Sequence, residues 1–337
     1  MTGPLAVTPG DPAGIGPDLL LTLAGELPAG TVAAFADPEG LARRARELGL
    51  EMVIEPWQPG SPLPAAGLAV APVAQPVAVP PGTPSPGNAP ALLSALAEAV
   101  AAITAGHCRG LVTGPLSKAV MTAGLERPFS GHTEILAELS GTGPPVMMLV
   151  GGGLRVALVT THLPLRAVPD RITEDRVRGT LRTVATALER DFDTPQPRIL
   201  VTGLNPHAGE EGHLGREEIE VIAPALESIR RELGSRAAIE GPVAADTAFL
   251  PDRTRTVDAV VAMYHDQGLA PLKQAAFGRA VNVTLGLPFV RTSVDHGTAF
   301  NLAGTGKADP GSLGEAISLA RELAGNRARP QEPNPRT

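Results

Sequence analysis

The stretch on which the interpretation of this chain depends is AVVAMYHDQGLAPLK, residues 259–273. Its apolar first half predicts a buried strand, which ends at His265 and Asp266 and is followed by a Gly-containing turn and Lys273. In an open α/β sheet, ligands bind in the crevice beyond the carboxyl ends of the strands. An imidazole, a carboxylate and an ammonium group at such an edge therefore indicate a site, although an ordinary polar turn at a strand end would have the same composition.

The composition is that of a globular protein long enough for two lobes. The chain has 337 residues, of which 43% are hydrophobic and 19% charged, whereas single domains cluster at about 100–150 residues. A formal net charge of −7 argues against a general nucleic-acid binder, which would need a basic face. No apolar run approaches the roughly 20 residues that cross a bilayer, and no secretory signal is apparent. A single cysteine, Cys108, fits a reducing compartment, so we expect a soluble cytoplasmic protein without nucleic-acid or membrane partners.

Short apolar runs alternate with helical patterns in the N-terminal part of the chain. The pattern predicts strands at 4–8, at 31–36 and from 110, and helices at 38–48 and 89–105. Such alternation is typical of α/β proteins with a largely parallel sheet. The glycines of loop 9–17 do not match G-x-G-x-x-G, and no Gly-Lys-Ser/Thr follows, so the Rossmann and phosphate-loop fingerprints are absent. Residues 56–90 are rich in Pro, Gly, Ala and Val, which predicts loops and edge strands.

Two predicted helix starts carry polar groups that suit an anion. His132 and Thr133 begin an amphipathic helix, and a helix N-terminus offers unpaired N–H groups and the positive end of a dipole. Capping by Ser130 or Thr133 explains the hydroxyl groups equally well, but not the histidine. Lys118 stands at another helix start, where capping by its neighbours is the more common explanation, but it is one of only three lysines in the chain.

Three apolar runs end at a histidine, namely His162, His207 and His265. One such histidine is usually a structural residue. If the three strands are neighbours, however, their ends converge, and three neutral imidazoles with an open fourth position are typical of a catalytic zinc site. The ion would polarise a substrate oxygen as a Lewis acid. The residues alone leave both explanations open.

The C-terminal third adds further polar groups. Asp246 lies in a small-residue turn, where it would orient a ligand, act as a base or cap a helix. Asn282 and Arg291 interrupt a strand pair predicted at 279–291, and Arg suits bidentate binding of a carboxylate or phosphate. These residues extend the set of candidates for anion binding and proton transfer.

The end of the chain is predicted as a Gly-rich turn at 295–310 and a final helix at 312–324. Gly325 is a natural stop for that helix. The tail at 326–337 has no apolar face, so we expect it to be disordered.

Five ordered motifs stand out along the chain: TPGDPAGIG at 8–16, SGHTE at 130–134, NPHAGE at 205–210, YHDQG at 264–268 and DHGTA at 295–299. Together they give the chain a close resemblance to the 4-hydroxythreonine-4-phosphate dehydrogenase family, NAD-dependent enzymes of pyridoxal phosphate biosynthesis. The resemblance implies two α/β domains flanking a cleft, as in the isocitrate and isopropylmalate dehydrogenases. The corresponding division is residues 1–125 with 272–325 for the cofactor, and 126–271 for substrate, metal and dimerisation.

The resemblance also implies roles for individual residues. The metal ligands would be His162, His207 and His265, and the residues that bind the substrate would be His132, Thr133, Lys273, Asn282 and Arg291. The turn that contains His296, Gly297, Thr298, Asn301 and Gly304 resembles the loop that wraps the adenosine end of the nucleotide. Relatives often carry an acidic residue at position 301, so Asn301 leaves the choice between NAD and NADP open. Asp246, Asp266 and Lys273 are the candidates for the general base.

The implied reaction is oxidation of the C3 hydroxyl of 4-(phosphooxy)-L-threonine by NAD, followed by loss of CO2. The implied partners are one divalent metal ion, with zinc favoured over magnesium or cobalt, and a second copy of the chain that completes each site. Two alternatives remain: a dehydrogenase of a related phosphorylated hydroxy acid, such as a phosphothreonate or phosphoerythronate, and a hydrolase that activates water on a three-histidine metal. The Gly-rich turn at His296 weighs against hydrolysis, which needs no nucleotide.

Overall fold

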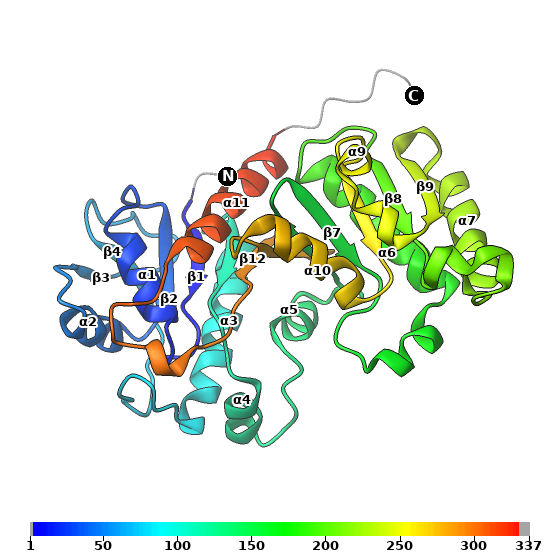
Figure 1. Ribbon diagram of the computed structural model, residues 1–337. Helices are drawn as coiled ribbons and strands as arrows, with labels where there is room; N and C mark the ends of the chain where they lie inside the picture. The colour runs from blue at the N-terminus through cyan, green and yellow to red at the C-terminus, as the bar shows by residue number, and fades with distance from the viewer. Residues whose placement is uncertain (1–2, 330–337) are drawn as a thin grey trace.

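A computed structural model describes residues 3–329, which form one twelve-stranded mixed sheet (Figure 1). The strands in chain order are β1 (Leu5–Thr8), β2 (Val32–Ala36), β3 (Ile54–Pro56), β4 (Leu68–Pro72), β5 (Gly110–Thr113), β6 (Val146–Gly151), β7 (Leu154–Leu158), β8 (Arg198–Thr202), β9 (Ala238–Val243), β10 (Ala259–Ala262), β11 (Val281–Leu285) and β12 (Val290–Val294). Across the sheet their order is β3-β4-β2-β1-β5-β12-β11-β6-β7-β10-β8-β9. The pairs β12-β11, β11-β6 and β6-β7 are antiparallel, whereas the other neighbours are parallel. Two parallel blocks are thus joined by an antiparallel middle.

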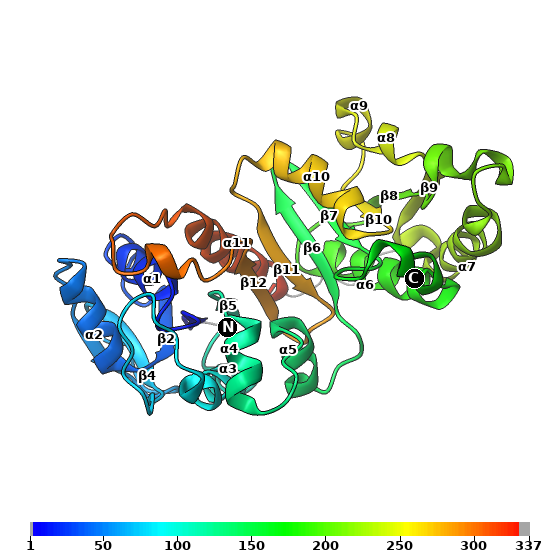
Figure 2. The ribbon, with the colours of Figure 1, turned by 60° about the horizontal axis from the view of Figure 1, so that its bottom comes forward.

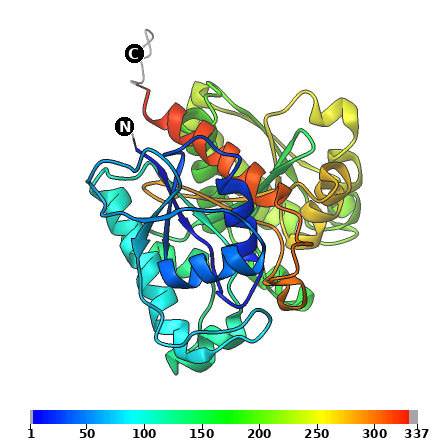
Figure 3. The same ribbon diagram turned by 90° about the vertical axis from the view of Figure 1, so that its left-hand side faces the viewer.

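Helices cover both faces of the sheet. They are α1 (Gly16–Ala24), α2 (Pro38–Glu47), α3 (Ala89–Thr104), α4 (Lys118–Leu125), α5 (His132–Ser140), α6 (Glu174–Arg190), α7 (Ala223–Leu233), α8 (Ala245–Ala248), α9 (Pro251–Thr254), α10 (His265–Ala276) and α11 (Gly311–Arg327). Along β1, Leu5 and Val7 pack into the apolar cluster of α1, α2, α6, α7 and α11, whereas Ala6 packs into the cluster of α3. Successive side chains of a strand point to opposite faces, so these clusters form two layers. Figure 2 shows α3, α4 and α5 grouped together, and Figure 3 shows α11 beside α1.

The predicted α/β class is confirmed. Strands β1 and β2 and helices α2 and α3 match their predicted ranges to within one residue at each end. Their residues carry local signals, such as Asp37, whose carboxylate accepts hydrogen bonds from Glu39 N and Gly40 N and caps α2. In the Pro-rich stretch, β3 is an edge strand as expected, but β4 lies inside the sheet between β3 and β2.

The Gly-containing turn predicted after His265 is wrong, because α10 begins at His265 and continues to Ala276. Gly268 lies inside this helix and faces the sheet. A Cβ at Gly268 would stand 2.7 Å from Val156 Cγ1 and 3.0 Å from Ala262 Cβ. The glycine therefore allows α10 to pack closely on β7 and β10, a demand of tertiary packing that the local sequence does not reveal.

The stop predicted at Gly325 is also wrong, because α11 continues to Arg327. The guanidinium of Arg327 donates to both carboxylate oxygens of Asp191, at 2.8 and 2.7 Å, after the end of α6. A tertiary ion pair thus extends the helix beyond a residue that often ends one. Of the predicted tail, residues 330–337 lie outside the described residues.

One helical segment corrects the expectation on apolar runs. Pro86–Thr104, with 19 residues, is long and apolar enough to cross a membrane by length and composition alone, and half of it is buried. Its residues Leu92, Leu96, Ala99 and Ile103 are buried at the spacing of one helix face. This is the pattern of a core helix, and α3 packs on β1, β2 and β5.

The predicted division into domains stays a prediction. The sheet continues across the predicted boundaries through the β12-β11 hairpin. The boundary between residues 271 and 272 falls inside α10, whose Leu269 and Leu272 pack in one cluster with Leu149 of β6 and Val156 of β7. Residues on both sides of the predicted boundary therefore pack on the same strands.

Candidate functional site

A cavity of about 1030 Å³ lies over the antiparallel middle of the sheet. Its walls come from the start of α5, the loop after β7, helix α6 and the strands β11 and β12. Seven residues to which the resemblance gives a role line it, namely His132, Thr133, His162, Asn282, Arg291, His296 and Gly297. Segments distant in the sequence thus bring the predicted substrate residues, apart from Lys273, to one place.

Arg291 is the buried cation of this cavity. Its side chain is 3% exposed and lies on β12 between β5 and β11. One terminal nitrogen donates to Thr284 Oγ1 at 2.8 Å and the other to Thr113 Oγ1 at 2.6 Å, while Nε has no partner within the described residues. Burial lowers the pKa of Arg291 to about 10, so the group stays charged at neutral pH. Its hydrogen-bond partners are neutral hydroxyls, and the Glu134 carboxylate acts on it only through its charge, so the group favours an anionic ligand.

His132 is the first residue of α5 and faces the same space. Its Nε2 is buried and has no partner among residues 3–329. Burial, followed by the charges of Arg291 and Lys118, lowers the pKa of His132 to about 3. The imidazole is therefore neutral at physiological pH. Asn282 on β11 adds a third buried polar atom without a partner in the described chain, its Oδ1. Buried polar groups normally have partners, so these three atoms indicate a site built for a polar ligand.

The sequence left open whether Lys118 faces a ligand, and in the structure Lys118 also lines the cavity. Ser117 does cap α4, since its Oγ accepts from Val120 N at 3.3 Å. Sequence reasoning missed Glu134 and Arg176, which line the same cavity. Glu134 belongs to the SGHTE motif, which is a signal for its selection, whereas Arg176 lies in an Arg-rich helix that gives no such signal.

The strands that carry the three histidines are neighbours. β10 pairs in parallel with β7 on one side and with β8 on the other, so the three chain segments leave the sheet at one edge. The rings of His162 and His265 lie 5.4 Å apart between centroids. His207 follows β8 in an exposed turn, and within residues 3–329 no three His, Cys, Asp or Glu side chains form a metal-binding group. The three-histidine centre therefore stays a prediction.

The donor chemistry of these residues fits a divalent ion. Burial, followed by the charges of Lys118 and His265, lowers the pKa of His162, which favours the neutral imidazole that binds metals. Nδ1 of His265 lies 2.8 Å from Asp266 Oδ1, which orients the ring and leaves Nε2 for a ligand. Asp266 itself is 88% exposed, and neither Asp266 nor His265 is among the residues that line the cavity.

The other candidates for catalysis do not line the cavity. Lys273 is half exposed on α10 and forms an ion pair with Asp295, with Nζ 2.9 Å from Oδ2. Asp246 lies exposed on the short helix α8. Asp295 was not selected from the sequence, although it directly precedes His296. The assignment of the general base stays a prediction.

The predicted nucleotide loop is tied to the loop after β1. Ile15 N donates to Thr298 O at 3.0 Å, and Gly304 N donates to Asp18 Oδ2 at 2.6 Å. Asp18 also forms a buried ion pair with Arg44 of α2. His296 and Gly297 line the large cavity, whereas Asn301 is exposed.

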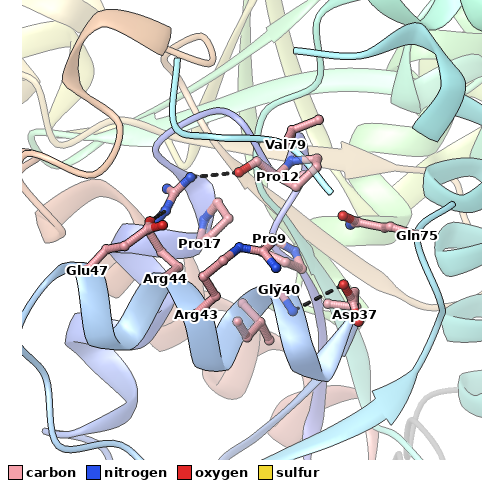
Figure 4. Close-up of a pocket in the computed structure, with 13 residues that line it drawn as sticks. Pro9, Pro12, Pro17, Asp37, Gly40, Arg43, Arg44, Glu47, Gln75 and Val79 are labelled. Carbon is pink, nitrogen blue, oxygen red and sulfur yellow. Dashed lines mark hydrogen bonds and ion pairs between the residues drawn. The ribbon is translucent and has the colours of Figure 1, made fainter. Parts of the chain in front are cut away.

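Arg44 borders a second, much smaller cavity of about 20 Å³ (Figure 4). In Figure 4 its guanidinium points to Pro12 O at 2.8 Å, and Gly40 N points to Asp37 Oδ2 at 3.1 Å. This space admits about one water molecule. The small cavity therefore belongs to the packing between the loop after β1 and α2.

Comparison with known proteins assigns the chain to a family. The model of the family described as pyridoxal phosphate biosynthetic protein PdxA matches residues 29–320. The chain is 52% identical over 326 residues to a 4-hydroxythreonine-4-phosphate dehydrogenase from Chromobacterium violaceum, covering 96% of this chain and 98% of the relative. It is 52% identical over 324 residues to the enzyme of the same name from Thioalkalivibrio sulfidiphilus, covering 95% and 96%.

A solved structure supports the same assignment. The crystal structure of 4-hydroxythreonine-4-phosphate dehydrogenase from Klebsiella pneumoniae is 35% identical and has a TM-score of 0.85. The match covers 96% of this chain and 100% of that one. The chain therefore belongs to the PdxA family of pyridoxal phosphate biosynthetic proteins.

Proposed function

We propose that this chain is an NAD-dependent dehydrogenase that oxidises 4-(phosphooxy)-L-threonine to 2-amino-3-oxo-4-phosphooxybutanoate in pyridoxal 5'-phosphate biosynthesis. The β-keto acid then loses CO2 to give 3-amino-2-oxopropyl phosphate. The observation that carries the proposal is the buried cation Arg291 beside His132 and Asn282 in one large cavity. The substrate has two anionic groups, a phosphate and a carboxylate, which match this environment. The names of the relatives supply the reaction.

The residues of the cavity would bind and orient the substrate. Arg291 offers its unpartnered Nε–H to an anionic oxygen, while the two threonine hydroxyls fix the plane of the guanidinium. His132, neutral and at the start of α5, offers one ring N–H, and Thr133 and the helix N-terminus add donors. Lys118, which lines the cavity, would supply further positive charge, and Lys273 would add to it from outside the cavity, where it pairs with Asp295. Holding the substrate in one orientation accelerates reaction by removing the entropy cost from the chemical step.

His162, His207 and His265 would hold the metal ion, with zinc favoured and magnesium or cobalt as alternatives. When bound, the ion supplies Lewis-acid polarisation of the substrate hydroxyl, and NAD or NADP in contact with the His296 loop supplies the hydride acceptor. The proton of the hydroxyl would pass to Asp246, Asp266 or Lys273. We further propose a cytoplasmic homodimer, in which the partner copy completes each site.

The test is NADH formation from a panel of substrates, with and without a chelator. The panel holds 4-(phosphooxy)-L-threonine, 4-phosphothreonate, 4-phosphoerythronate and an aromatic dihydrodiol. We expect the first compound to give the highest kcat/KM, and the chelator to abolish the signal. A higher kcat/KM with another phosphorylated acid would reassign the substrate. A lack of NADH from every compound would favour metal-dependent hydrolysis.

A further inference from the structure

The turn that carries His207 has an unusual backbone. Five successive residues, His207 to Glu211, have positive φ angles between 45° and 83°. Only Gly209 among them adopts this left-handed conformation without steric cost. Such a run persists only where the surrounding structure determines it, and strain of this kind gathers at functional sites.

A buried carboxylate, that of Glu218, lies beneath this turn. Glu218 is 4% exposed and begins the π-helical segment Glu218–Ile222. Its Oε1 accepts from Leu204 N at 2.7 Å and from Asn205 N at 2.8 Å, and its Oε2 accepts from Asn205 Nδ2 at 3.0 Å. The carboxylate has no lysine, arginine or histidine partner in the described chain. The carboxylate is thus hydrogen-bonded by the backbone that leads into the turn and by the Asn205 side chain.

Two glycines bring the turn against this carboxylate. A Cβ at Gly203 would stand 2.9 Å from Glu218 Oε1, and a Cβ at Gly209 would stand 2.7 Å from Glu218 Oε2. The chain therefore contacts the carboxylate both before and inside the left-handed run. Gly203 is also held from the opposite side, because its carbonyl accepts from Gln267 Nε2 at 2.8 Å.

We propose that Glu218 is a positioning residue that fixes the left-handed turn and so places the His207 imidazole. This inference rests on the proposed function in one respect, namely that His207 is a metal ligand. Groups that orient a metal-binding side chain without binding the metal themselves typically contribute about 10–100-fold to metal affinity. Glu218 would act through the backbone of the turn, without touching substrate or metal.

The experiment compares four full-length proteins: wild type, Glu218→Gln, Glu218→Ala and the control Glu220→Ala. Glu220 lies on the same segment but is 58% exposed and pairs with Arg216. The readouts are zinc affinity by competition with a chelator, deuterium exchange of the amides at 205–211, and the melting temperature. We expect zinc affinity about 10–100-fold weaker for Glu218→Ala. Exchange at 205–211 should be faster, and Glu218→Gln should be intermediate because it keeps one acceptor oxygen. The control should match wild type.

A double variant tests the positioning role of Glu218 separately from the role of His207 as a metal ligand. If Glu218 acts through His207, Glu218→Ala should weaken zinc binding no further once His207→Ala is present. Wild-type zinc affinity and exchange in Glu218→Ala would overturn the positioning role. Unchanged zinc affinity in His207→Ala would instead overturn the metal assignment of the proposed function, while faster exchange in Glu218→Ala would still support its role in fixing the turn. Should Glu218→Ala fail to fold, Glu218→Gln carries the same comparison.

Discussion

Gln267 on α10 accepts a hydrogen bond from Thr202 Oγ1, at 2.8 Å, and so joins α10 to the end of β8. The same Oε1 accepts from Met263 N at 2.7 Å, and Nε2 donates to Gly203 O. One side chain therefore connects the ends of β10 and β8 to the helix that begins at His265. The segments that lead to His207 and His265 are coupled through it.

Replacing Gln267 with Met should destabilise the protein, because the buried partners lose their hydrogen bonds while the volume is nearly kept. Each buried group left without a partner costs about 1–3 kcal/mol. The free energy of unfolding in urea measures the change. Gln274→Met on the exposed side of the same helix is the matched control and should stay within about 0.5 kcal/mol of wild type. Equal stability of the two variants would contradict the role assigned to Gln267.

Replacing Arg291 with Met should separate activity from stability. We expect kcat/KM to fall by about 10–100-fold or more, since hydrogen bonds to charged groups contribute about 1.5–3 kcal/mol. The melting temperature should change little, because removal of a buried charge without a hydrogen-bonded carboxylate offsets the loss of the hydrogen bonds to the Thr284 and Thr113 hydroxyls. Arg279→Met, whose side chain is 75% exposed near the start of β11, should change neither quantity. Retained activity in Arg291→Met would contradict the proposal that Arg291 binds an anionic group of the substrate.

Stability should fall on acidification because of His132. Its pKa is lowered from 6.5 to about 3 in the fold, so above pH 6.5 both folded and unfolded forms are neutral and the group contributes nothing. Below pH 6.5 the His132 imidazole is protonated in the unfolded chain but stays neutral in the folded chain. The free energy of unfolding therefore falls progressively toward pH 3. Melting temperatures across this range should fall less steeply for His132→Gln. The exposed His107→Gln should follow wild type; parallel curves for all three proteins would be evidence against a buried neutral His132.

Replacing His265 with Ala should remove bound metal and turnover while the fold stays intact. Metal content by mass spectrometry, circular dichroism and NADH formation measure the three quantities. The exposed His213→Ala serves as control and should keep metal and activity. Full activity of a His265→Ala protein free of metal would exclude the proposed chemistry.

Removing Asp18 should destabilise the fold and loosen the predicted nucleotide loop. Asp18→Ala removes the buried carboxylate partner of Arg44 but leaves the partly exposed Glu47, so the loss should be about 1.5–3 kcal/mol. It also removes the acceptor for Gly304 N, so KM for NAD should rise. Asp252→Ala breaks the exposed pair with Arg255 and should change stability by less than about 1 kcal/mol. A KM for NAD unchanged in a folded Asp18→Ala protein would argue against the loop as a cofactor contact.

The sequence by itself determined the elements whose signals are local. Apolar runs bounded by turns predicted β1, β2 and β10, and a helical pattern predicted α2, because each signal lies within a few residues of the element. The histidines that follow β7, β8 and β10 were recognised for the same reason, and the five motifs identified the family.

Tertiary structure alone decided which of these residues meet. The strand order places β7, β10 and β8 side by side and brings His132 and Arg291 into one cavity, because pairing between distant strands depends on the whole sheet. It also made Gly268 a helical residue, extended α11 past Gly325, and fixed His207 in a left-handed turn above Glu218. In each case packing and buried hydrogen bonds from distant segments outweigh the local preference of the chain.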